Sequence, residues 1–267
     1  MVNTEQTNTT PNPFTVVTWN ILLDNTRTNQ GLMKSQSERL ASQIATLEKL
    51  REKIGGELDV VAMQEVHRTD LQHNGEELAR ALGYGAGYWI EHNQKPFPDS
   101  PTGRKGEYVG LFGGSIDHIE PIELGDNRRA VLSQVGKTAI ANIHPRARVS
   151  NWKLQEEQVK IVLEQTKDYE SMAFVGDFNN RLGGKARQAI EAEGFESVFS
   201  VMGKRHPKTW PTPAYRRLMY GRRARFFAPA VTLDDIYVRG LTVHDAGTFV
   251  GDSDHVGLWA KLSKDDG

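Results

Sequence analysis

Short apolar runs of strand length alternate along this chain with segments of helical periodicity, and this alternation constrains the fold more than any other feature. Residues 14–19, Phe-Thr-Val-Val-Thr-Trp, are β-branched and aromatic, as strands prefer. Residues 35–54 carry apolar side chains at helical spacing, and two glycines follow them. Residues 58–63 form an apolar run suited to a buried strand. The order strand, helix, strand indicates a fold of mixed strands and helices.

The remainder of the chain repeats this pattern. Several short strand-like runs separated by turn residues lie within residues 88–143. Further elements are predicted as helices over residues 70–82, 149–166 and 185–193, and as strands over residues 172–175, 231–238, 241–243 and 256–262. A sequence of 267 residues with no internal repeat or linker suits one domain. We expect a single domain over residues 14–267, with a two-sheet core and outer helices, after a flexible N-terminal tail over residues 1–13.

The amino-acid composition and the N-terminal sequence indicate the cellular compartment and the kind of metal site to expect. The chain contains no Cys, which excludes disulfides and thiolate metal ligands. Its formal net charge of −1 gives no general attraction to polyanions. The polar N-terminus lacks the features of a signal peptide, and no apolar stretch reaches membrane-spanning length. We therefore expect a cytoplasmic protein without a membrane partner.

Polar or ionisable residues follow the apolar runs at several positions. Four predicted strands end in such residues, namely Asn20, Glu65, Asp177 with Asn179, and Asp234. Two further strand ends lie at or near His144 and the pair Asp254 and His255. If the strands lie side by side, their ends meet at one edge of the sheets, where ligands and catalytic residues gather. The sequence therefore predicts that these residues converge.

The predicted cluster combines residue types that metal-assisted phosphoryl transfer uses. Its carboxylates, in a chain without thiols, select Mg²⁺, Mn²⁺ or Ca²⁺ over zinc. Its amides and imidazoles can donate hydrogen bonds to a phosphate, where charge develops in the transition state. A carboxylate beside an imidazole can orient the ring and stabilise its charged form. These residue types indicate phosphoryl transfer to water.

Six short segments together carry a family signature. They are residues 18–20 (Thr-Trp-Asn), 64–65 (Gln-Glu), 142–144 (Asn-Ile-His), 176–179 (Gly-Asp-Phe-Asn), 233–236 (Leu-Asp-Asp-Ile) and 253–255 (Ser-Asp-His). In this order they resemble the endonuclease/exonuclease/phosphatase superfamily, which includes deoxyribonuclease I, exonuclease III-type abasic endonucleases, neutral sphingomyelinases, inositol polyphosphate 5-phosphatases and deadenylases. The resemblance spans residues 14–262. It implies an α/β fold, a four-layer sandwich of two mixed β-sheets face to face with helices outside.

The resemblance also implies a metal site and a phosphate site. Glu65 resembles the principal metal ligand, and Asp254 is similar to a residue near the metal. Asn20 resembles a residue close to the metal or the phosphate, and Asn179 resembles a phosphate-binding residue. The implied cofactor is Mg²⁺, with Mn²⁺ as the alternative.

Catalytic roles follow from the same resemblance. Asp177 resembles the residue that orients or deprotonates the attacking water. His144 resembles the imidazole that stabilises the phosphate or the leaving group, and His255 the one that acts on the phosphate or the water. Asp234 resembles the carboxylate that orients His255, because the family's strand reads Asp-x-Ile. Glu107 is similar to a carboxylate that pairs with the first histidine in deoxyribonuclease I.

Two features of the resemblance disagree about the substrate. Abasic endonucleases and the tyrosyl-DNA phosphodiesterase of the family carry Asp two residues after the first Asn, whereas this chain has Leu22, with Asp24 nearby. This departure weakens an assignment to DNA repair. In contrast, residues 253–258 are similar to the ending of the tyrosyl-DNA phosphodiesterase.

A basic and aromatic segment, residues 204–225, precedes the predicted strand that carries Asp234. It contains no Asp or Glu, and aromatic residues such as Trp210 are interleaved with its basic ones. Basic side chains neutralise phosphates, and aromatic rings stack on bases. We predict that the segment binds a polyanionic substrate, with Arg222 and Arg223 as substrate-binding residues. The alternative is a solvated loop whose charge aids solubility.

Charge reversal in this segment tests the predicted contact. Changing Arg222, Arg223 and Arg225 together to Glu should raise the KM for a polyanionic substrate steeply. It should also weaken the salt dependence of KM, because each lost phosphate contact lowers the number of counterions released. Steady-state kinetics at several salt concentrations measure both effects. Unchanged kinetics on the natural substrate would contradict the prediction.

These observations lead to one leading function and two alternatives. The leading hypothesis is a Mg²⁺-dependent phosphoesterase, a hydrolase that cleaves a phosphodiester bond in nucleic acid as a nuclease or a DNA-end-processing enzyme. The first alternative, favoured by Leu22, is a phosphatase or phosphodiesterase of a small-molecule or lipid-headgroup phosphate. The second is a catalytically inactive binding module that keeps the scaffold. The sequence leaves open endo- versus exo-cleavage, the number of metals and the oligomeric state.

Overall fold

The computed structural model describes residues 12–21, 36–68, 74–85, 87–93, 106–147, 151–220 and 229–264. Outside these ranges lie residues 1–11 of the predicted N-terminal tail, Leu22, Asp24, Arg222, Arg223 and Arg225. Within the described residues, the strands form two six-stranded sheets.

Both sheets mix parallel and antiparallel strands. The first has the order β11 (Leu241–Phe249), β12 (Gly257–Lys264), β1 (Phe14–Asn20), β2 (Val60–Arg68), β4 (Gly106–Phe112) and β3 (Gly87–Asn93). The second has the order β5 (His118–Gly125), β6 (Arg128–Val135), β7 (Thr138–Ile143), β8 (Met172–Asp177), β10 (Asp234–Arg239) and β9 (Glu196–Ser197). Strands β1 and β2 run parallel, as do β7 and β8, whereas the other paired neighbours are antiparallel.

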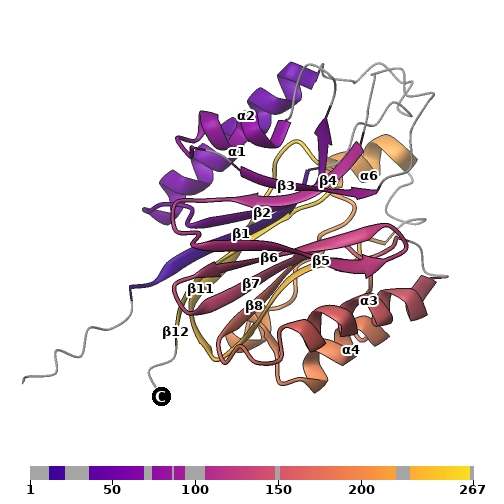
Figure 1. Cartoon of the computed structure of the whole chain (residues 1–267). Helices are drawn as coiled ribbons and strands as arrows, with labels where there is room; N and C mark the ends of the chain where they lie inside the picture. Colours follow the sequence, from indigo (N-terminus) through magenta and orange to yellow (C-terminus); the bar gives the residue numbers. More distant parts are fainter. Residues whose placement is uncertain are drawn as a thin grey trace, which may run out of the picture.

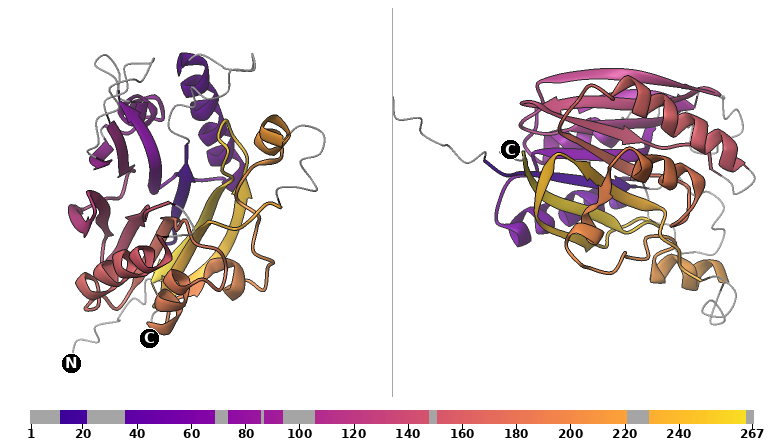
Figure 2. Two further views of the ribbon diagram at one scale, coloured as in Figure 1. Left: turned by 90° about the vertical axis from the view of Figure 1, so that its right-hand side faces the viewer. Right: turned by 90° about the horizontal axis from the view of Figure 1, so that it is seen from below.

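The two sheets lie face to face, and helices cover both outer faces (Figure 1). Helices α1 (Gln36–Ile54) and α2 (Asn74–Ala81) pack on the first sheet, and α3 (Trp152–Gln165) and α4 (Lys185–Ala192) pack on the second. Two further helices, α5 (Val198–Val201) and α6 (Pro213–Tyr220), precede β10 in the chain. Figure 2 shows the layers from two further directions. The predicted four-layer α/β sandwich is confirmed. No helix in the described part of the chain is both long and apolar enough to cross a membrane.

The alternation of side chains along β1 shows how the layers are held together. Val16 points between the sheets and packs in one cluster with Val175 of β8. Its neighbours Val17 and Trp19 point to the opposite face and pack with Leu47 of α1. Because successive strand residues face opposite sides, a strand with apolar residues on both faces fits only between two covering layers. Each such buried side chain contributes about 1.5–3 kcal/mol of hydrophobic stabilisation.

Glu65 and Asp234 do not end their strands, although the sequence predicts that they do. Strand β2 continues past Glu65, which lies at an irregularity in the pairing with β4 between Met63 and Val66 and has a φ of 54°. Such a bulge lets the strand continue while it redirects one side chain. Asp234 does not end a strand but begins β10, where it pairs with Asp177 of the antiparallel β8. The prediction of strand ends was wrong at both positions. A polar residue can also lie where a strand continues past a polar site, as Glu65 does, or where a strand begins, as Asp234 does.

Candidate active site

One end of the sandwich brings the predicted site residues together. Strand β1 ends at Asn20, β8 ends at Asp177 and β10 begins at Asp234. His144 directly follows β7, which is parallel to β8. Because β10 runs antiparallel to β8, its beginning lies at the same edge as the end of β8. Glu65 joins them from the bulge in β2, so both sheets contribute to the site.

The backbone after β7 and β8 takes a conformation that fixes the Asp177 carboxylate. Gly176 has a φ of 139°, and a Cβ there would lie 2.0 Å from the Ile143 carbonyl oxygen, so the position requires glycine. Asn179 has a φ of 48°, a left-handed conformation that Asn tolerates better than most residues. Its backbone N–H donates to Asp177 Oδ1 at 2.8 Å, and its Nδ2 donates to the Pro145 carbonyl oxygen at 3.0 Å. The turn itself therefore orients Asp177.

Asn20 connects the carboxylates of the two sheets. Its Nδ2 donates to Glu65 Oε1 at 3.0 Å and to Asp177 Oδ2 at 3.1 Å. Desolvation raises the pKa of the partly buried Glu65, and the negative charges of Glu107 and Asp254 raise it further. This local excess of negative charge favours a nearby cation.

A chain of ion pairs positions His144. Its Nδ1 lies 3.3 Å from Glu107 Oε1, which also lies 3.3 Å from Arg128 Nη1. Its Nε2 lies 3.8 Å from Asp177 Oδ2 and 3.9 Å from Glu65 Oε1. Burial opposes a charge on the ring, but the contact with Glu107 and the charge of Asp177 outweigh burial and raise the pKa of His144. His144 can therefore donate a hydrogen bond from Nε2 into the site.

Two carboxylates stabilise the charged form of His255. Its Nδ1 lies 2.8 Å from Asp234 Oδ2, and its Nε2 lies 3.7 Å from Asp177 Oδ2. Although burial opposes the charge, Asp234 and Asp177 raise the pKa of His255 well above its usual value. Burial likewise opposes the ionisation of Asp177, but the charges of His255 and His144 hold the pKa of Asp177 below its usual range. These shifts favour an ionised Asp177 between two protonated imidazole rings.

The loop that carries His255 is fixed by several hydrogen bonds. Ser253 Oγ donates to the Asn20 carbonyl oxygen at 2.6 Å, and the His255 backbone N–H donates to Ser253 Oγ at 3.0 Å. Trp210 Nε1 donates to Asp254 Oδ2 at 2.9 Å. Through Trp210, the described part of the basic and aromatic segment reaches the site. Arg222 and Arg223, the substrate-binding residues predicted in that segment, lie outside the described residues.

Two sets of side chains could hold a divalent cation. Asp177, Asp234 and His255 place ligand atoms within 4.8 Å of one another. Glu65 and Asp254, which the sequence predicts as ligands, line a cavity that also contacts Asp177 and His255. Asp254 Oδ1 is buried and has no hydrogen-bond partner among the described residues. A buried carboxylate oxygen in this state fits a site completed by a cation, and oxygen donors suit Mg²⁺ or Mn²⁺.

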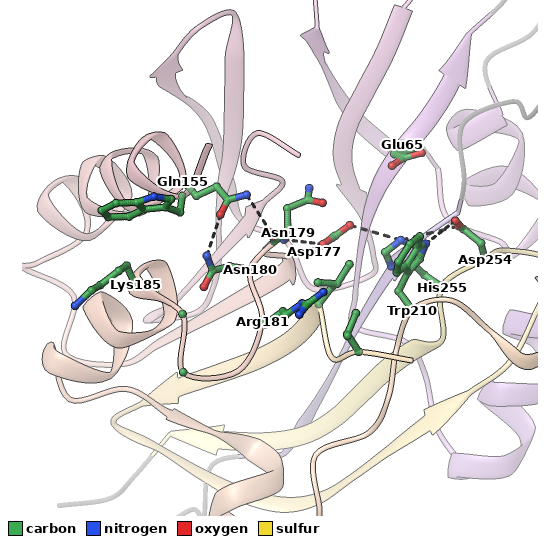
Figure 3. A pocket seen from close by; sticks show the side chains of 15 residues that line it. Glu65, Gln155, Asp177, Asn179, Asn180, Arg181, Lys185, Trp210, Asp254 and His255 are labelled. Carbon is green, nitrogen blue, oxygen red and sulfur yellow. Dashed lines mark hydrogen bonds and ion pairs between the residues drawn. The ribbon is translucent and has the colours of Figure 1, made fainter. Parts of the chain in front are cut away.

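A cavity of about 640 Å³ opens over these residues (Figure 3). Glu65, Asp254 and His255 lie toward one end of the cavity, and Gln155 and Lys185 lie toward the other. The sequence does not predict five further residues that line the cavity, namely Trp152, Gln155, Asn180, Arg181 and Lys185. Asn180 and Arg181 lie in the turn after β8, and the packing of α3 and α4 on the second sheet brings the other three to the site. The available signal was the Gly183-Gly184 pair that precedes the predicted helix over residues 185–193.

The arrangement of the two sheets recurs in solved structures. The catalytic domain of human Nocturnin with a bound sulfate anion is 18% identical, with 95% of each chain covered and a TM-score of 0.70. Humanized D. rerio TDP2 is 18% identical, and the match covers 94% of this chain and 99% of that chain with a TM-score of 0.63. The mannosyl-6-phosphatase Bt3783 of Bacteroides thetaiotaomicron is 16% identical, and the match covers 93% of this chain and 99% of that chain with a TM-score of 0.62. At these identities the likeness shows the shared fold alone.

Sequence comparison places the chain in a family. A comparison with curated proteins gives no match. The model of the Endonuclease/Exonuclease/phosphatase family matches residues 17–255. This range extends from within β1 to His255 and therefore includes each of the six segments that carry the resemblance. The chain belongs to the Endonuclease/Exonuclease/phosphatase family.

Proposed function

We propose that the protein is a divalent-metal-dependent phosphodiesterase that cleaves nucleic acid, as a nuclease or a DNA-end-processing enzyme. The observation that carries this proposal is the position of the Asp177 carboxylate, 3.8 Å from His144 Nε2 and 3.7 Å from His255 Nε2. Two positively charged donors beside one ionised carboxylate suit the attack of water on a phosphate, whose oxygens carry the developing charge. Membership of a family of phosphoesterases supports the reaction class.

We assign the cation to Glu65 and Asp254, and we place Asn20 beside the cation and the phosphate. Its amide N–H₂ group donates to Glu65 and Asp177 and so positions these two carboxylates. Asp254 Oδ1, which lies 3.9 Å from His255 Nε2 and accepts no hydrogen bond from the described residues, and the raised pKa of Glu65, which desolvation and neighbouring negative charges cause, both favour a cation between these carboxylates. When bound, the metal supplies Lewis-acid polarisation of a phosphoryl oxygen.

The side chains of the protein itself orient the water and stabilise the phosphate. Asp177 accepts a hydrogen bond from the attacking water and aligns it with the scissile P–O bond. Because the two imidazolium rings hold the pKa of Asp177 low, this carboxylate is a weak base that orients the water more than it deprotonates it. His144 and His255 donate hydrogen bonds to phosphoryl oxygens, and Asp234 keeps His255 Nε2 directed into the site. Asn179, which lines the cavity, adds a further amide donor.

Removal of divalent cations tests this reaction class. Excess EDTA should abolish hydrolysis of bis(p-nitrophenyl) phosphate, and added Mg²⁺ or Mn²⁺ should restore it, because the site's carboxylates repel an anionic phosphate without a cation. The release of p-nitrophenolate at fixed pH measures the rate. Full activity in EDTA would contradict the metal requirement. Failure to cleave any phosphate ester with either cation would indicate a catalytically inactive binding module.

A phosphatase or phosphodiesterase of a small-molecule or lipid-headgroup phosphate is the second candidate. The cavity volume of about 640 Å³ lies within the range of about 300–1,000 Å³ that small-molecule sites occupy. A neighbour with the same fold is named a mannosyl-6-phosphatase. A panel of plasmid DNA, single-stranded DNA, RNA, phosphoinositide, sphingomyelin, a sugar phosphate and an aryl phosphate would separate the two candidates. A higher kcat/KM for a sugar phosphate or a lipid headgroup than for any nucleic acid would favour this second function.

A further inference from the structure

The cavity continues past the reacting end to a second region, which we call the distal subsite and define by Trp152, Arg181 and Lys185. In Figure 3, Lys185 lies across the cavity from Glu65 and Asp254, and Arg181 lies between them. A phosphate at the reacting end would leave this region open to the rest of the substrate. The distal subsite therefore faces whatever group is attached to the scissile phosphate.

Hydrogen bonds from α3 join the two ends of the cavity. Gln155 of α3 is buried, and its Nε2 donates to the Arg146 carbonyl oxygen at 2.7 Å and to the Asn179 carbonyl oxygen at 3.0 Å. Its Oε1 accepts a hydrogen bond from Asn180 Nδ2 at 2.9 Å. These contacts tie the first turns of α3 to the turn that orients Asp177. The backbone that carries Trp152 and Arg181 is thereby held relative to the reacting end, whereas the side chains of the distal subsite remain exposed.

The distal subsite carries positive charge that no carboxylate in the described residues neutralises. The side chains of Arg181 and Lys185 are exposed, and neither makes an ion pair within the described part of the chain. Glu156, which responds electrostatically to Lys185, is already paired with Lys160 at 2.6 Å. The reacting end is acidic, so the cavity is electrically polarised along its length. Two unpaired cations in a cleft attract an anionic group of the ligand.

Trp152 gives the same region an aromatic wall. It is the first residue of α3, lines the cavity, and remains 43% exposed. Lys153 Nζ lies over one face of the Trp152 ring, 5.4 Å from the centroid, so stacking of a planar ring uses the opposite face, and such stacking is tolerant of base sequence. Trp152 and the two cations therefore offer one contact for a ring and one for an anion.

We propose that the distal subsite binds the neighbouring nucleotide of a single-stranded substrate, with its base on Trp152 and its phosphate on Arg181 and Lys185. The inference rests on the proposed phosphodiesterase function. It specifies the substrate of the enzyme as a nucleic-acid strand with at least two adjacent phosphates. A monophosphate or a simple diester fills only the reacting end. A single-stranded nucleic acid fills both ends of the cavity. The enzyme therefore prefers it to a monophosphate or a simple diester.

Binding and turnover of matched variants test the proposal. The binding probe is a fluorescently labelled oligothymidylate with anisotropy as the readout, measured with Mg²⁺ in an Asp177→Asn background, so that the cation is present and hydrolysis is slow. The double variant Arg181→Ala/Lys185→Ala should weaken binding by about 10-fold or more, because charge-assisted contacts are lost. Trp152→Ala should weaken it by about 10-fold through loss of stacking. With Mg²⁺, the loss of kcat/KM on oligothymidylate should exceed the loss on bis(p-nitrophenyl) phosphate by about 10-fold.

The control removes equal charge outside the cavity. Lys49→Ala/Lys137→Ala alters two exposed lysines that do not line the cavity, one in α1 and one between β6 and β7, and should leave oligothymidylate affinity within about 2-fold of the wild type. Equal losses in the control and in Arg181→Ala/Lys185→Ala would overturn the proposal, as would unchanged affinity in the latter. If the wild type cleaves neither substrate, the proposed function fails, while the binding measurement still decides whether the distal subsite exists.

Discussion

Replacement of Asp177 by Asn is expected to lower kcat by about 10³-fold or more at saturating Mg²⁺. The amide keeps the shape of the side chain and can still accept the Asn179 N–H that Asp177 Oδ1 accepts at 2.8 Å. It removes the negative charge that orients the water and helps to keep His144 and His255 charged. Turnover of bis(p-nitrophenyl) phosphate measures kcat, and thermal unfolding followed by circular dichroism checks that the variant is folded.

Three further variants show whether the loss of kcat arises because Asp177 and His255 act together. Asp168→Asn removes an exposed carboxylate away from the cavity and should leave kcat within about 2-fold of the wild type. His255→Gln should cause a loss similar to that of Asp177→Asn. The double variant of Asp177 and His255 should lose little more than either single variant, because residues that act together are non-additive. Wild-type turnover in Asp177→Asn would refute the role of this carboxylate.

The strands could be predicted because their signals are local. Residues 14–19 and 172–175 were expected as strands, and they form most of β1 and β8. The order of strands in each sheet could not be predicted in the same way. Strand β1 lies between β12 and β2, although β12 is at the far end of the described chain. No local pattern specifies such a partner, because the pairing depends on how both complete sheets bury their faces.

The site was predictable where a polar residue follows an apolar run. Asn20 and Asp177 do so, and the structure places them within 3.1 Å of each other. Glu65 and Asp234 reach the same place by a bulge and by a strand start, which the apolar pattern does not distinguish from a strand end. Residues that enter from helices, such as Lys185, have no such signal. An exposed helical Lys and a substrate-binding one have the same sequence pattern.

Arg187 illustrates this limit most clearly. It lies in the helix predicted over residues 185–193, where a surface position would be the ordinary expectation for Arg, yet its side chain is 0% exposed. Its Nη1 donates to Asp235 Oδ2 at 2.6 Å. Its other nitrogens donate to the carbonyl oxygens of Asn180 and Leu233, each at 2.8 Å. The guanidinium therefore joins the turn after Asp177 to the start of β10.

Replacement of Arg187 by Met is expected to lower the free energy of unfolding by about 3–5 kcal/mol at pH 7, because Asp235 remains buried without its cation. Burial opposes the ionisation of Asp235, but the ring of His206, whose Nδ1 lies 3.5 Å from Oδ2, the charge of Arg187 and a hydrogen bond from Ser197 hold the pKa of Asp235 below its usual range. The wild type therefore gains stability from Asp235 above its unfolded pKa of about 3.9 and loses it as the pH falls through the lower folded pKa. Equilibrium urea unfolding at pH 7 and at acidic pH measures both effects, and the variant's deficit should shrink at acidic pH.

The partner substitution decides whether the deficit arises from the buried charge. Asp235→Asn keeps an oxygen that can accept the hydrogen bonds from Ser197 Oγ at 2.7 Å and the Ile236 N–H at 2.9 Å. The double variant Arg187→Met/Asp235→Asn should therefore recover a substantial part of the stability that Arg187→Met loses, since no uncompensated carboxylate remains. A deficit in Arg187→Met within about 1 kcal/mol of the wild type would contradict the buried ion pair as a main support of this end of the sandwich. A full deficit that persists in the double variant would instead assign the stability to the hydrogen bonds that Arg187 makes to the backbone of the turn and of β10.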